Sequence, residues 1–138
     1  MSLRIEEYSH YDPLEILPLY ESVDWVNYVK NPQILENAYR NSLKIYAAYS
    51  GSRLVGIIRV VGDGFSVVFV QDLLVSPDCQ LRGIGSALLK KVLEEYPQVY
   101  QMHLLTDNTE KNASFYRSLG FVRDADIHCS AFSRYYIL

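Results

Sequence analysis

A long apolar run, FSVVFVQDLLV from Phe65 to Val75, places the strongest limit on what this chain can fold into. After Ser66, only Gln71 and Asp72 interrupt its apolar character, so both faces of the predicted strand are apolar. Two apolar faces are typical of a central strand that other elements cover on both sides. The run therefore predicts a layered α/β protein with this strand inside its sheet.

Turn, cap and periodicity signals divide the rest of the chain into short helices and strands. Asp12-Pro13 and Asn31-Pro32 each indicate a helix start, with a capping residue before a proline at the first helical position. Because no internal repeat, linker or low-complexity stretch divides the chain, we predict a single domain over residues 1–138. The predicted order is β-α-α-β-β-β-α-β-α-β-β, over residues 3–8, 13–22, 32–41, 45–49, 54–61, 65–75, 83–96, 99–105, 113–119, 121–124 and 132–138.

Composition and charge argue against several classes of protein. The 13 basic and 16 acidic residues give a net charge of −3, and no basic cluster is longer than Lys90-Lys91, so nucleic acid is not an expected partner. No apolar run approaches the roughly 20 residues that a membrane span needs, so no membrane association is expected. No basic and apolar signal segment opens the chain, so we expect a cytoplasmic protein.

Cysteines and histidines give no sign of a metal site. Cys79 and Cys129 are the two cysteines, and they lack the CxxC spacing of a zinc site. We expect both to be free thiols in a reducing cytosol. His10, His103 and His128 share no helical or strand spacing, so we assign no metal.

Two glycines, Gly83 and Gly85, stand at the start of a predicted amphipathic helix in QLRGIGSALL, Gln80 to Leu89. A helix N-terminus has unpaired N–H donors and a partial positive charge, so it binds phosphate readily. Glycine lets a phosphate approach the backbone because no Cβ obstructs it. A loop glycine with one close packing contact is the alternative. The dinucleotide and P-loop fingerprints do not fit, because Leu88 stands where a third glycine belongs and no GK[ST] follows.

The same segment resembles the acyl-CoA-binding motif of the GCN5-related N-acetyltransferases (GNAT), [QR]-x-x-G-x-[GA], with Gln80, Gly83 and Gly85 at its specified positions. ASFYRSLGF, from Ala113 to Phe121, resembles the second signature of that family. The predicted order of elements also matches the family along nearly the whole chain. The resemblance implies a mixed, mostly antiparallel central sheet flanked by helices, with acetyl-CoA as the acetyl donor.

A finer resemblance covers Trp25 to Phe121. The segments NPQILENAYRNS, LVGIIRVVGDG, QDLLVSP and TDNTEKNASFY are similar to a small bacterial branch related to the plant serotonin N-acetyltransferases. This resemblance implies an N-acetyltransferase that acts on a primary amine, such as a small aralkylamine. A non-catalytic acyl-CoA-binding or sensing module and a regulatory protein-binding domain are the alternatives. The oligomeric state stays open, with a homodimer as one option.

The resemblance also implies a coenzyme site. In the family the pyrophosphate lies on the N–H groups of the glycine loop, and an N–H near a bulge in the preceding strand polarises the thioester oxygen. An asparagine often precedes the tyrosine of the second signature, and Asn108 and Asn112 are the two candidates here. The expected coenzyme-binding residues are Leu74, Val75, Gln80, Leu81, Arg82, Gly83, Ile84, Gly85, Ser86, Asn108, Asn112 and Tyr116.

Acetyl transfer needs an acceptor for the proton of the ammonium and a donor for the leaving thiolate. Asp72 is the carboxylate on the central strand that leads to the coenzyme loop, so we predict it as the base. A structural aspartate that bonds a backbone N–H or an arginine is the alternative. The resemblance assigns the acid role to Tyr116, and an aromatic packed under the coenzyme is the alternative for that residue.

Trp25 and Tyr28 lie in SVDWVNYVK, which has no clear period and which we predict as a loop between the first two helices. In the resembling fold this loop often covers the acceptor site. Aromatic rings bind an alkylammonium through cation–π contacts, so both residues are candidates for acceptor binding. Ordinary packing of the loop on the core is the alternative.

Overall fold

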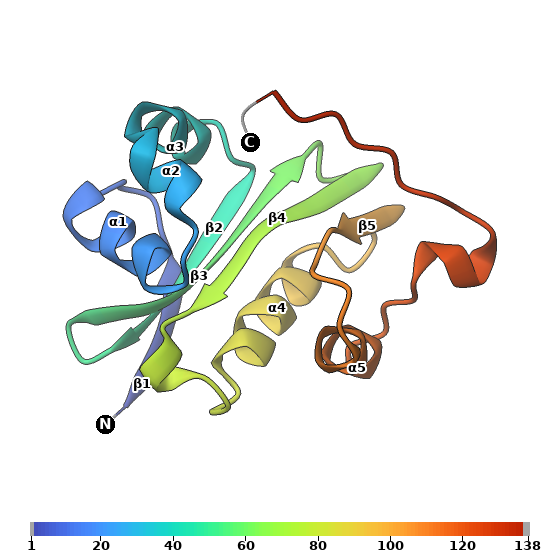
Figure 1. Cartoon of the computed structure of the whole chain (residues 1–138). Coiled ribbons are helices and arrows are strands. Elements are labelled where there is room, and N and C mark those ends of the chain that lie inside the picture. The colour runs from blue at the N-terminus through green and yellow to red at the C-terminus, as the bar shows by residue number, and fades with distance from the viewer. Residues whose placement is uncertain (1, 137–138) are drawn as a thin grey trace. The chain divides into compact units, whose positions relative to one another are not determined.

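The predicted central strand is β4, Val67–Val75, which lies between two other strands in the computed structural model of the chain (Figure 1). The structure describes residues 2–136. β4 is antiparallel to β3, Arg53–Gly62, and parallel to β5, Gln101–Leu104. Within the described residues the sheet has the order β1-β2-β3-β4-β5, and the pairs before β4 are antiparallel. The predicted fold class, a mixed and mostly antiparallel sheet flanked by helices, is confirmed.

Up to α5 the remaining elements follow the predicted order, with one more helix before the second strand. Asp12 caps the first helix as predicted, because its side chain accepts a hydrogen bond from the N–H of Leu14. The helix predicted at Pro32 also begins there, but the side chain of Asn31 donates to the carbonyl of Asn27 instead of capping it. The other elements are β1 (Leu3–Glu7), α1 (Pro13–Ser22), α2 (Val26–Lys30), α3 (Pro32–Arg40), β2 (Lys44–Ser50), α4 (Ile84–Glu95), α5 (Glu110–Ser118) and the 3₁₀ turns η1 (Pro77–Cys79) and η2 (Asp124–Ile127).

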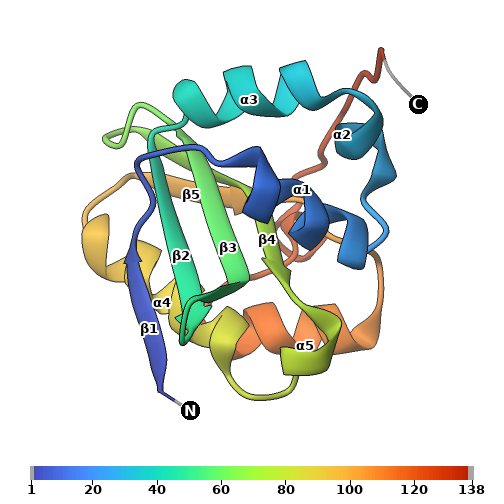
Figure 2. The ribbon, with the colours of Figure 1, turned by 90° about the vertical axis from the view of Figure 1, so that its left-hand side faces the viewer.

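Helices α1 and α4 lie on opposite faces of the sheet (Figure 1 and Figure 2). Two neighbouring residues of β3 show this, because successive strand side chains point to opposite faces. Ile57 lies in a buried cluster with residues of α1. A Cβ on Gly56 would lie 3.1 Å from Leu88 and 3.2 Å from Ile84, both in α4. The absence of a side chain at Gly56 therefore lets α4 pack closely on the sheet.

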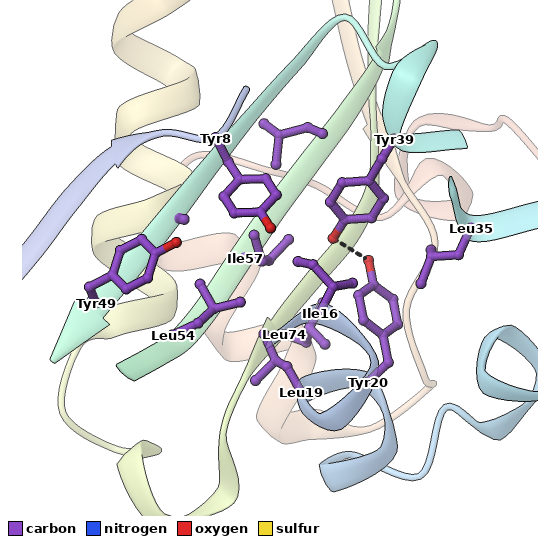
Figure 3. Close-up of a cluster of buried hydrophobic side chains, with 12 residues drawn as sticks. Tyr8, Ile16, Leu19, Tyr20, Leu35, Tyr39, Tyr49, Leu54, Ile57 and Leu74 are labelled. Atoms are coloured by element: carbon purple, nitrogen blue, oxygen red, sulfur yellow. Dashed lines mark hydrogen bonds between the residues drawn. The ribbon is translucent and has the colours of Figure 1, made fainter. Parts of the chain in front are cut away.

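A cluster of buried side chains fills the face of the sheet next to α1 and α3 (Figure 3). It consists of Tyr8, Ile16, Leu19, Tyr20, Leu35, Tyr39, Ile45, Ala47, Tyr49, Leu54, Ile57 and Leu74. The tyrosines bring hydroxyl groups into the core, and buried hydroxyls need hydrogen-bond partners. Figure 3 shows two of them joined, with 2.9 Å between the hydroxyl oxygens of Tyr20 and Tyr39. This part of the core is therefore both aromatic and polar.

A β-bulge in β4 decides which of its side chains face this cluster. The register against β3 shifts between Val70 and Asp72, so Gln71 is the extra residue. Such a bulge moves the alternation of side chains along the strand by one residue. Asp72 therefore shares its face with Leu74, a member of the cluster, whereas Val70 points to the opposite face. The bulge brings the carboxylate to the tyrosines.

Two helix predictions differ from the structure. α2 forms in SVDWVNYVK, where the sequence predicts a loop, because its five residues are too few to show a period. α5 begins at Glu110 rather than at Ala113, because Thr109 caps it by accepting a hydrogen bond from the N–H of Asn112. Gly120 follows the end of α5 with a φ of 93°, as predicted for the residue after a helix.

The strands predicted at residues 121–124 and 132–138 are wrong for the described part of the chain. Residues 124–127 form η2, and no strand follows β5 up to residue 136, while residues 137 and 138 lie outside the described part. Phe132, Tyr135 and Tyr136 favour strands but are 96%, 64% and 81% exposed. A segment with strand propensity forms a strand only when another strand pairs with it.

Contacts divide the chain into two compact units, residues 1–104 and 105–138. The first unit contains the sheet and α1 to α4, and the second contains α5 and the C-terminal segment. The single domain over residues 1–138 stays a prediction.

Candidate active site

The glycine loop opens α4 with a backbone conformation that favours glycine. Gly83 has a φ of 80°, and a Cβ there would have nothing within 4 Å. The alternative of a close packing contact therefore does not hold at Gly83, and the glycine serves the backbone turn. Gly83 has no side chain that could cap α4. The N–H groups of Ile84, Gly85 and Ser86 at the start of the helix therefore have no capping side chain. This N-terminus can bind an anion through its backbone.

Side-chain hydrogen bonds hold the chain between β4 and α4. Arg53 donates to both carboxylate oxygens of Asp78, at 2.7 and 2.9 Å, and this pairing lowers the pKa of Asp78. The side chain of Gln80 donates to a backbone carbonyl at the end of β4, at 3.0 Å. Leu81, with a φ of 64°, is 91% exposed, and Arg82 is exposed beside it. Arg82 is therefore open to a ligand, whereas Gln80 orders the loop.

The edge of β4 that leads to this loop lacks a strand partner. β5 pairs with β4 over Val67–Val70, and no strand lies on that side of the rest of β4 in residues 2–136. Leu74 and Val75 pair with β3 on the other side. The bulge lies at Gln71, upstream of these two residues. Beyond Val70, the backbone N–H groups of β4 that point away from β3 therefore make no hydrogen bond to a neighbouring strand in the described part of the chain.

Asp72 lies in a buried ion pair. Its Oδ2 accepts one hydrogen bond from Nε of Arg59 and one from the hydroxyl of Tyr20, both at 2.8 Å. Asp72 is 2% exposed and Arg59 is 3% exposed. A carboxylate is buried in this way only when charged and hydrogen-bonding partners compensate for the loss of water. The carboxylate of Asp72 is therefore compensated by hydrogen bonds from Arg59 and Tyr20 rather than by solvent.

Two more hydroxyl groups extend this network. The hydroxyl of Tyr20 also bonds that of Tyr39, and Nη1 of Arg59 donates to Oγ of Ser42 at 3.2 Å. Burial raises the pKa of both tyrosines, and the charge of Asp72 raises each further. Burial acts to lower the pKa of Arg59, but the attraction of Asp72 outweighs it and the pKa is raised. At neutral pH the phenols of Tyr20 and Tyr39 beside this ion pair are therefore protonated.

Trp25 and Tyr28, the predicted acceptor-binding residues, pack on the ring of Tyr20. Trp25 immediately precedes α2 and Tyr28 lies within it. Their ring centroids lie 5.9 and 5.5 Å from that of Tyr20, both edge to face. Trp25 is 38% exposed and Tyr28 is half-buried. The structure thus connects Trp25 and Tyr28 to Asp72 through Tyr20.

Sequence reasoning missed Tyr20 and Arg59. Arg59 interrupts the apolar strand LVGIIRVVG and pairs in register with Asp72 on the next strand. A charge in a buried strand needs a partner, so a carboxylate for Arg59 could have been sought on the next strand, although regular pairing would place Gln71 opposite Arg59 and only the bulge brings Asp72 there. Tyr20 carries no comparable signal, because it is one of 12 tyrosines.

Tyr116 lies in the second unit, in the last turn of α5. Its ring centroid lies 4.9 Å from that of Phe115 and 5.9 Å from that of Phe121. Burial raises the pKa of its hydroxyl, and a side-chain hydrogen bond with Thr106 offsets part of the rise. A phenol with a raised pKa stays protonated at neutral pH, as a proton donor must.

Asn108 and Asn112 differ in the hydrogen bonds that their side chains make within the second unit. Nδ2 of Asn112 donates to the carbonyl of Asp107 at 3.2 Å, and its N–H donates to the capping Thr109. Asn108 is exposed and accepts one long bond, 3.5 Å, from Arg123. Asn112 therefore stabilises the turn before α5, and Asn108 has more of its amide free for a ligand.

Residues 2–136 contain no group of three or more His, Cys, Asp or Glu that could hold a metal ion. None of the helices in this range is long and apolar enough to cross a membrane. Cys79 is buried and Cys129 is exposed, and both are free thiols, as predicted.

The chain matches a family model described as an acetyltransferase (GNAT) domain over residues 41–123. The matched range is more than half of the chain and runs from the start of β2 to beyond α5. It therefore includes the glycine loop and Tyr116.

Several known proteins are similar to this chain. The uncharacterized N-acetyltransferase ycf52 of Porphyra purpurea is 30% identical over 118 residues, which cover 81% of this chain and 66% of that protein. Serotonin N-acetyltransferase 2, chloroplastic, of Oryza sativa subsp. japonica is 33% identical over 80 residues, which cover 58% and 40%. The chain thus spans 66% or less of the length of these relatives. The solved GNAT family acetyltransferase SP0256 of Streptococcus pneumoniae TIGR4 is 42% identical, with a TM-score of 0.89 over 98% of both chains.

Proposed function

The chain belongs to the GNAT family of acetyltransferases, and we therefore propose that it transfers an acetyl group from acetyl-CoA to a primary amine. The observation that carries this proposal is the N-terminus of α4, where Gly83 turns the backbone and leaves the first N–H groups uncapped. An uncapped helix N-terminus binds phosphate through its N–H groups and its dipole. The pyrophosphate of acetyl-CoA is a ligand of this kind.

We assign the coenzyme to groups on both sides of this N-terminus. The N–H groups from Gly83 to Ser86 would bind the pyrophosphate, and Arg82 would add a positive charge. The edge of β4 beyond Val70 would bind the acyl arm, with an N–H at Leu74 or Val75 on the thioester oxygen. The remaining coenzyme contacts of this proposal are those of Gln80, Leu81, Tyr116 and one of Asn108 and Asn112.

The proposed reaction forms a C–N bond and breaks the C–S bond of the thioester. An alkylammonium, with a pKa near that of lysine at about 10.4, must first lose a proton. We assign this proton to Asp72 by way of water, because Asp72 is only 2% exposed and the Tyr20 hydroxyl that bonds its Oδ2 is fully buried. The leaving thiolate takes a proton from Tyr116, which its raised pKa keeps protonated, and the second proton that the nitrogen loses on forming the amide returns Tyr116 to its phenol form.

We propose a small aralkylamine as the acceptor. The support is the pair of aromatic residues, Trp25 and Tyr28, on the ring of Tyr20. A cation–π contact with such rings contributes about 0.5–2 kcal/mol to the binding of an ammonium. The free thiols of Cys79 and Cys129 are consistent with a reducing compartment, and we propose the cytoplasm.

A screen of primary amines tests the function, with release of the CoA thiol as the readout. We expect thiol release with aralkylamines, and mass spectrometry should find the N-acetylated amine. Binding of acetyl-CoA without thiol release for any amine would instead support a non-catalytic acyl-CoA-binding module. Failure to bind any CoA in calorimetry would support a regulatory protein-binding domain.

A further inference from the structure

Tyr20 connects the buried ion pair to the candidate acceptor residues. Its side chain is 0% exposed, its hydroxyl bonds Asp72, and its ring contacts those of Trp25 and Tyr28. We infer that Tyr20 is a positioning residue for the acceptor. Its anchored hydroxyl fixes the ring on which Trp25 and Tyr28 form an aromatic wall that selects aralkylamines over alkylamines. This inference rests on the proposed function and names the substrate class of the same site.

The hydroxyl end of Tyr20 is anchored by charged groups. Asp72 accepts its hydrogen bond at 2.8 Å with the same oxygen that accepts from Arg59. The guanidinium of Arg59 also lies 5.7 Å from the ring centroid of Tyr39, whose hydroxyl bonds that of Tyr20. Hydrogen bonds to an ionised group are roughly twice as strong as bonds between neutral groups. The hydroxyl therefore has little freedom to move.

The other end of Tyr20 holds the start of α2. The N–H of Trp25 donates to the carbonyl of Tyr20 at 3.1 Å, and Asp24 between them has a φ of 63°. Edge-to-face aromatic pairs depend on the angle between the rings. A tilt of the Tyr20 ring would therefore displace Trp25 and Tyr28 together.

The charge balance around Asp72 favours selection by aromatic contact. Arg59 neutralises Asp72, and both are nearly inaccessible to solvent. An approaching ammonium therefore gains little attraction from this carboxylate. The rings of Trp25 and Tyr28 can contact both an ammonium and an aromatic group of the acceptor. An aralkylamine uses both contacts, whereas an alkylamine of equal charge uses only the first.

The single tryptophan of the chain makes this wall observable without any turnover. Trp25 is that tryptophan, so its fluorescence reports amine binding at the wall. We would titrate 2-phenylethylamine and butylamine into the chain in the presence of CoA and follow Trp25 emission. We expect the wild-type chain to bind 2-phenylethylamine more tightly than butylamine.

Tyr20→Phe keeps the ring and removes the hydroxyl anchor. We expect the Kd for 2-phenylethylamine to rise about three- to tenfold, as the loss of one hydrogen bond would produce. The Kd values for butylamine and CoA should not rise comparably. Loss of this selectivity is a result that a general loss of stability would not produce.

Tyr49→Phe is the matched control. Tyr49 belongs to the same buried cluster and its hydroxyl also bonds a carboxylate, but in the described part of the chain its side-chain hydrogen bonds and ring contacts are with Glu15 and Arg4. We expect this variant to keep the wild-type Kd for 2-phenylethylamine. Equal weakening in both variants, or no change in Tyr20→Phe, would overturn the inference, as would equal binding of the two amines by the wild type.

A second variant covers a failure of Tyr20→Phe to fold, which near-UV circular dichroism would detect. Arg59→Lys keeps the positive charge but loses the guanidinium geometry that bonds Asp72 and Ser42. Arg59→Lys should raise the Kd for 2-phenylethylamine but not that for butylamine, and an equal rise for both amines would contradict the inference.

The thiol-release assay distinguishes this inference from the proposed function. An active enzyme whose Tyr20→Phe variant keeps its amine affinity refutes the inference and leaves the proposed function standing.

Discussion

Burial changes what the carboxylate of Asp72 can do. The sequence leaves two interpretations of this residue, a catalytic base and a structural partner of an arginine. The structure pairs it with Arg59 and Tyr20, so it has a structural contact whatever its part in catalysis. Its role as the base stays a prediction.

Asp72→Asn keeps the shape of the side chain and removes its charge. We expect a loss of stability of about 3–5 kcal/mol, because Arg59 would be left buried without its counter-charge. If Asp72 is the base, acetyl transfer should also fall and kcat/KM should lose its acidic limb, while acetyl-CoA affinity holds. Thermal melting and a pH–rate profile on one preparation separate these effects.

Asp78→Asn is the control for this variant, because Asp78 also pairs with an arginine but is exposed. Exposed ion pairs contribute little to stability, so its melting temperature should change little. An unchanged pH profile in Asp72→Asn would leave Asp72 a structural residue and move the base to water or the backbone.

Tyr116→Phe tests the proposed acid. The ring remains against Phe115 and Phe121, so acetyl-CoA affinity should hold while kcat falls by about 10²–10⁴-fold. Burial raises the pKa of Tyr116, so the basic limb of the wild-type profile should lie at strongly alkaline pH and be absent from the variant. Tyr100→Phe, at an 80% exposed position, should behave as the wild type. A normal rate in Tyr116→Phe would assign the residue to packing.

The N-terminus of α4, which we propose as the pyrophosphate site, begins with a glycine that its backbone conformation favours. Gly83 adopts a positive φ with open space around its missing Cβ, and the helix that it opens has no side-chain cap. Glycines are poor helix formers, yet at this position they cost little and leave the backbone N–H groups accessible. The element is therefore stabilised by the packing of its later residues, Leu88, Leu89 and Val92, on the sheet.

Gly83→Val and Gly85→Val should each weaken acetyl-CoA binding, because a branched side chain would obstruct the path of the pyrophosphate. Calorimetry on the folded variants measures this. Gly51→Val is the matched control for the backbone strain at Gly83, because Gly51 has a φ of 63° and equally open space in a hairpin turn. Wild-type affinity in both loop variants would rule out the phosphate-binding role of this N-terminus.

Exposed apolar side chains in residues 105–138 bear on the assembly of the protein. Phe132, Tyr135 and Tyr136 are largely exposed, and β5 is an edge strand of the sheet in the described residues. Large exposed apolar groups and unpaired strand edges are features of surfaces that bind another chain. We propose that the chain forms a homodimer in which a second copy covers Phe132, Tyr135 and Tyr136.

Light scattering coupled to size-exclusion chromatography tests this assembly. We expect a dimer for the wild-type chain and a monomer for a Phe132→Ser, Tyr136→Ser double variant. Leu14→Ser, at an 86% exposed position outside this segment, should remain dimeric. A monomeric wild-type chain at micromolar concentration would contradict the proposal.

Local interactions explain the parts of the fold that could be predicted. Asp12 caps α1 because its carboxylate reaches an N–H two residues away. Gly120 follows α5 with a positive φ, a local conformation that favours glycine. The apolar run of β4 and the period of α4 likewise depend on residues close in sequence. The sequence alone therefore sufficed for the order of most elements, for the fold class and for the glycine loop.

Contacts between distant residues account for the rest. The bulge at Gln71 turns Asp72 toward Tyr20, which lies 52 positions earlier in the chain, and no local pattern predicts that meeting. The predicted C-terminal strands fail for a related reason, because strand propensity needs a partner that only the tertiary arrangement supplies. The sequence by itself thus determined the starts of α1 and α3 and the glycines at the start of α4 and after α5. The tertiary structure decided that Asp72 is paired and buried, and that Tyr20 connects it to Trp25 and Tyr28.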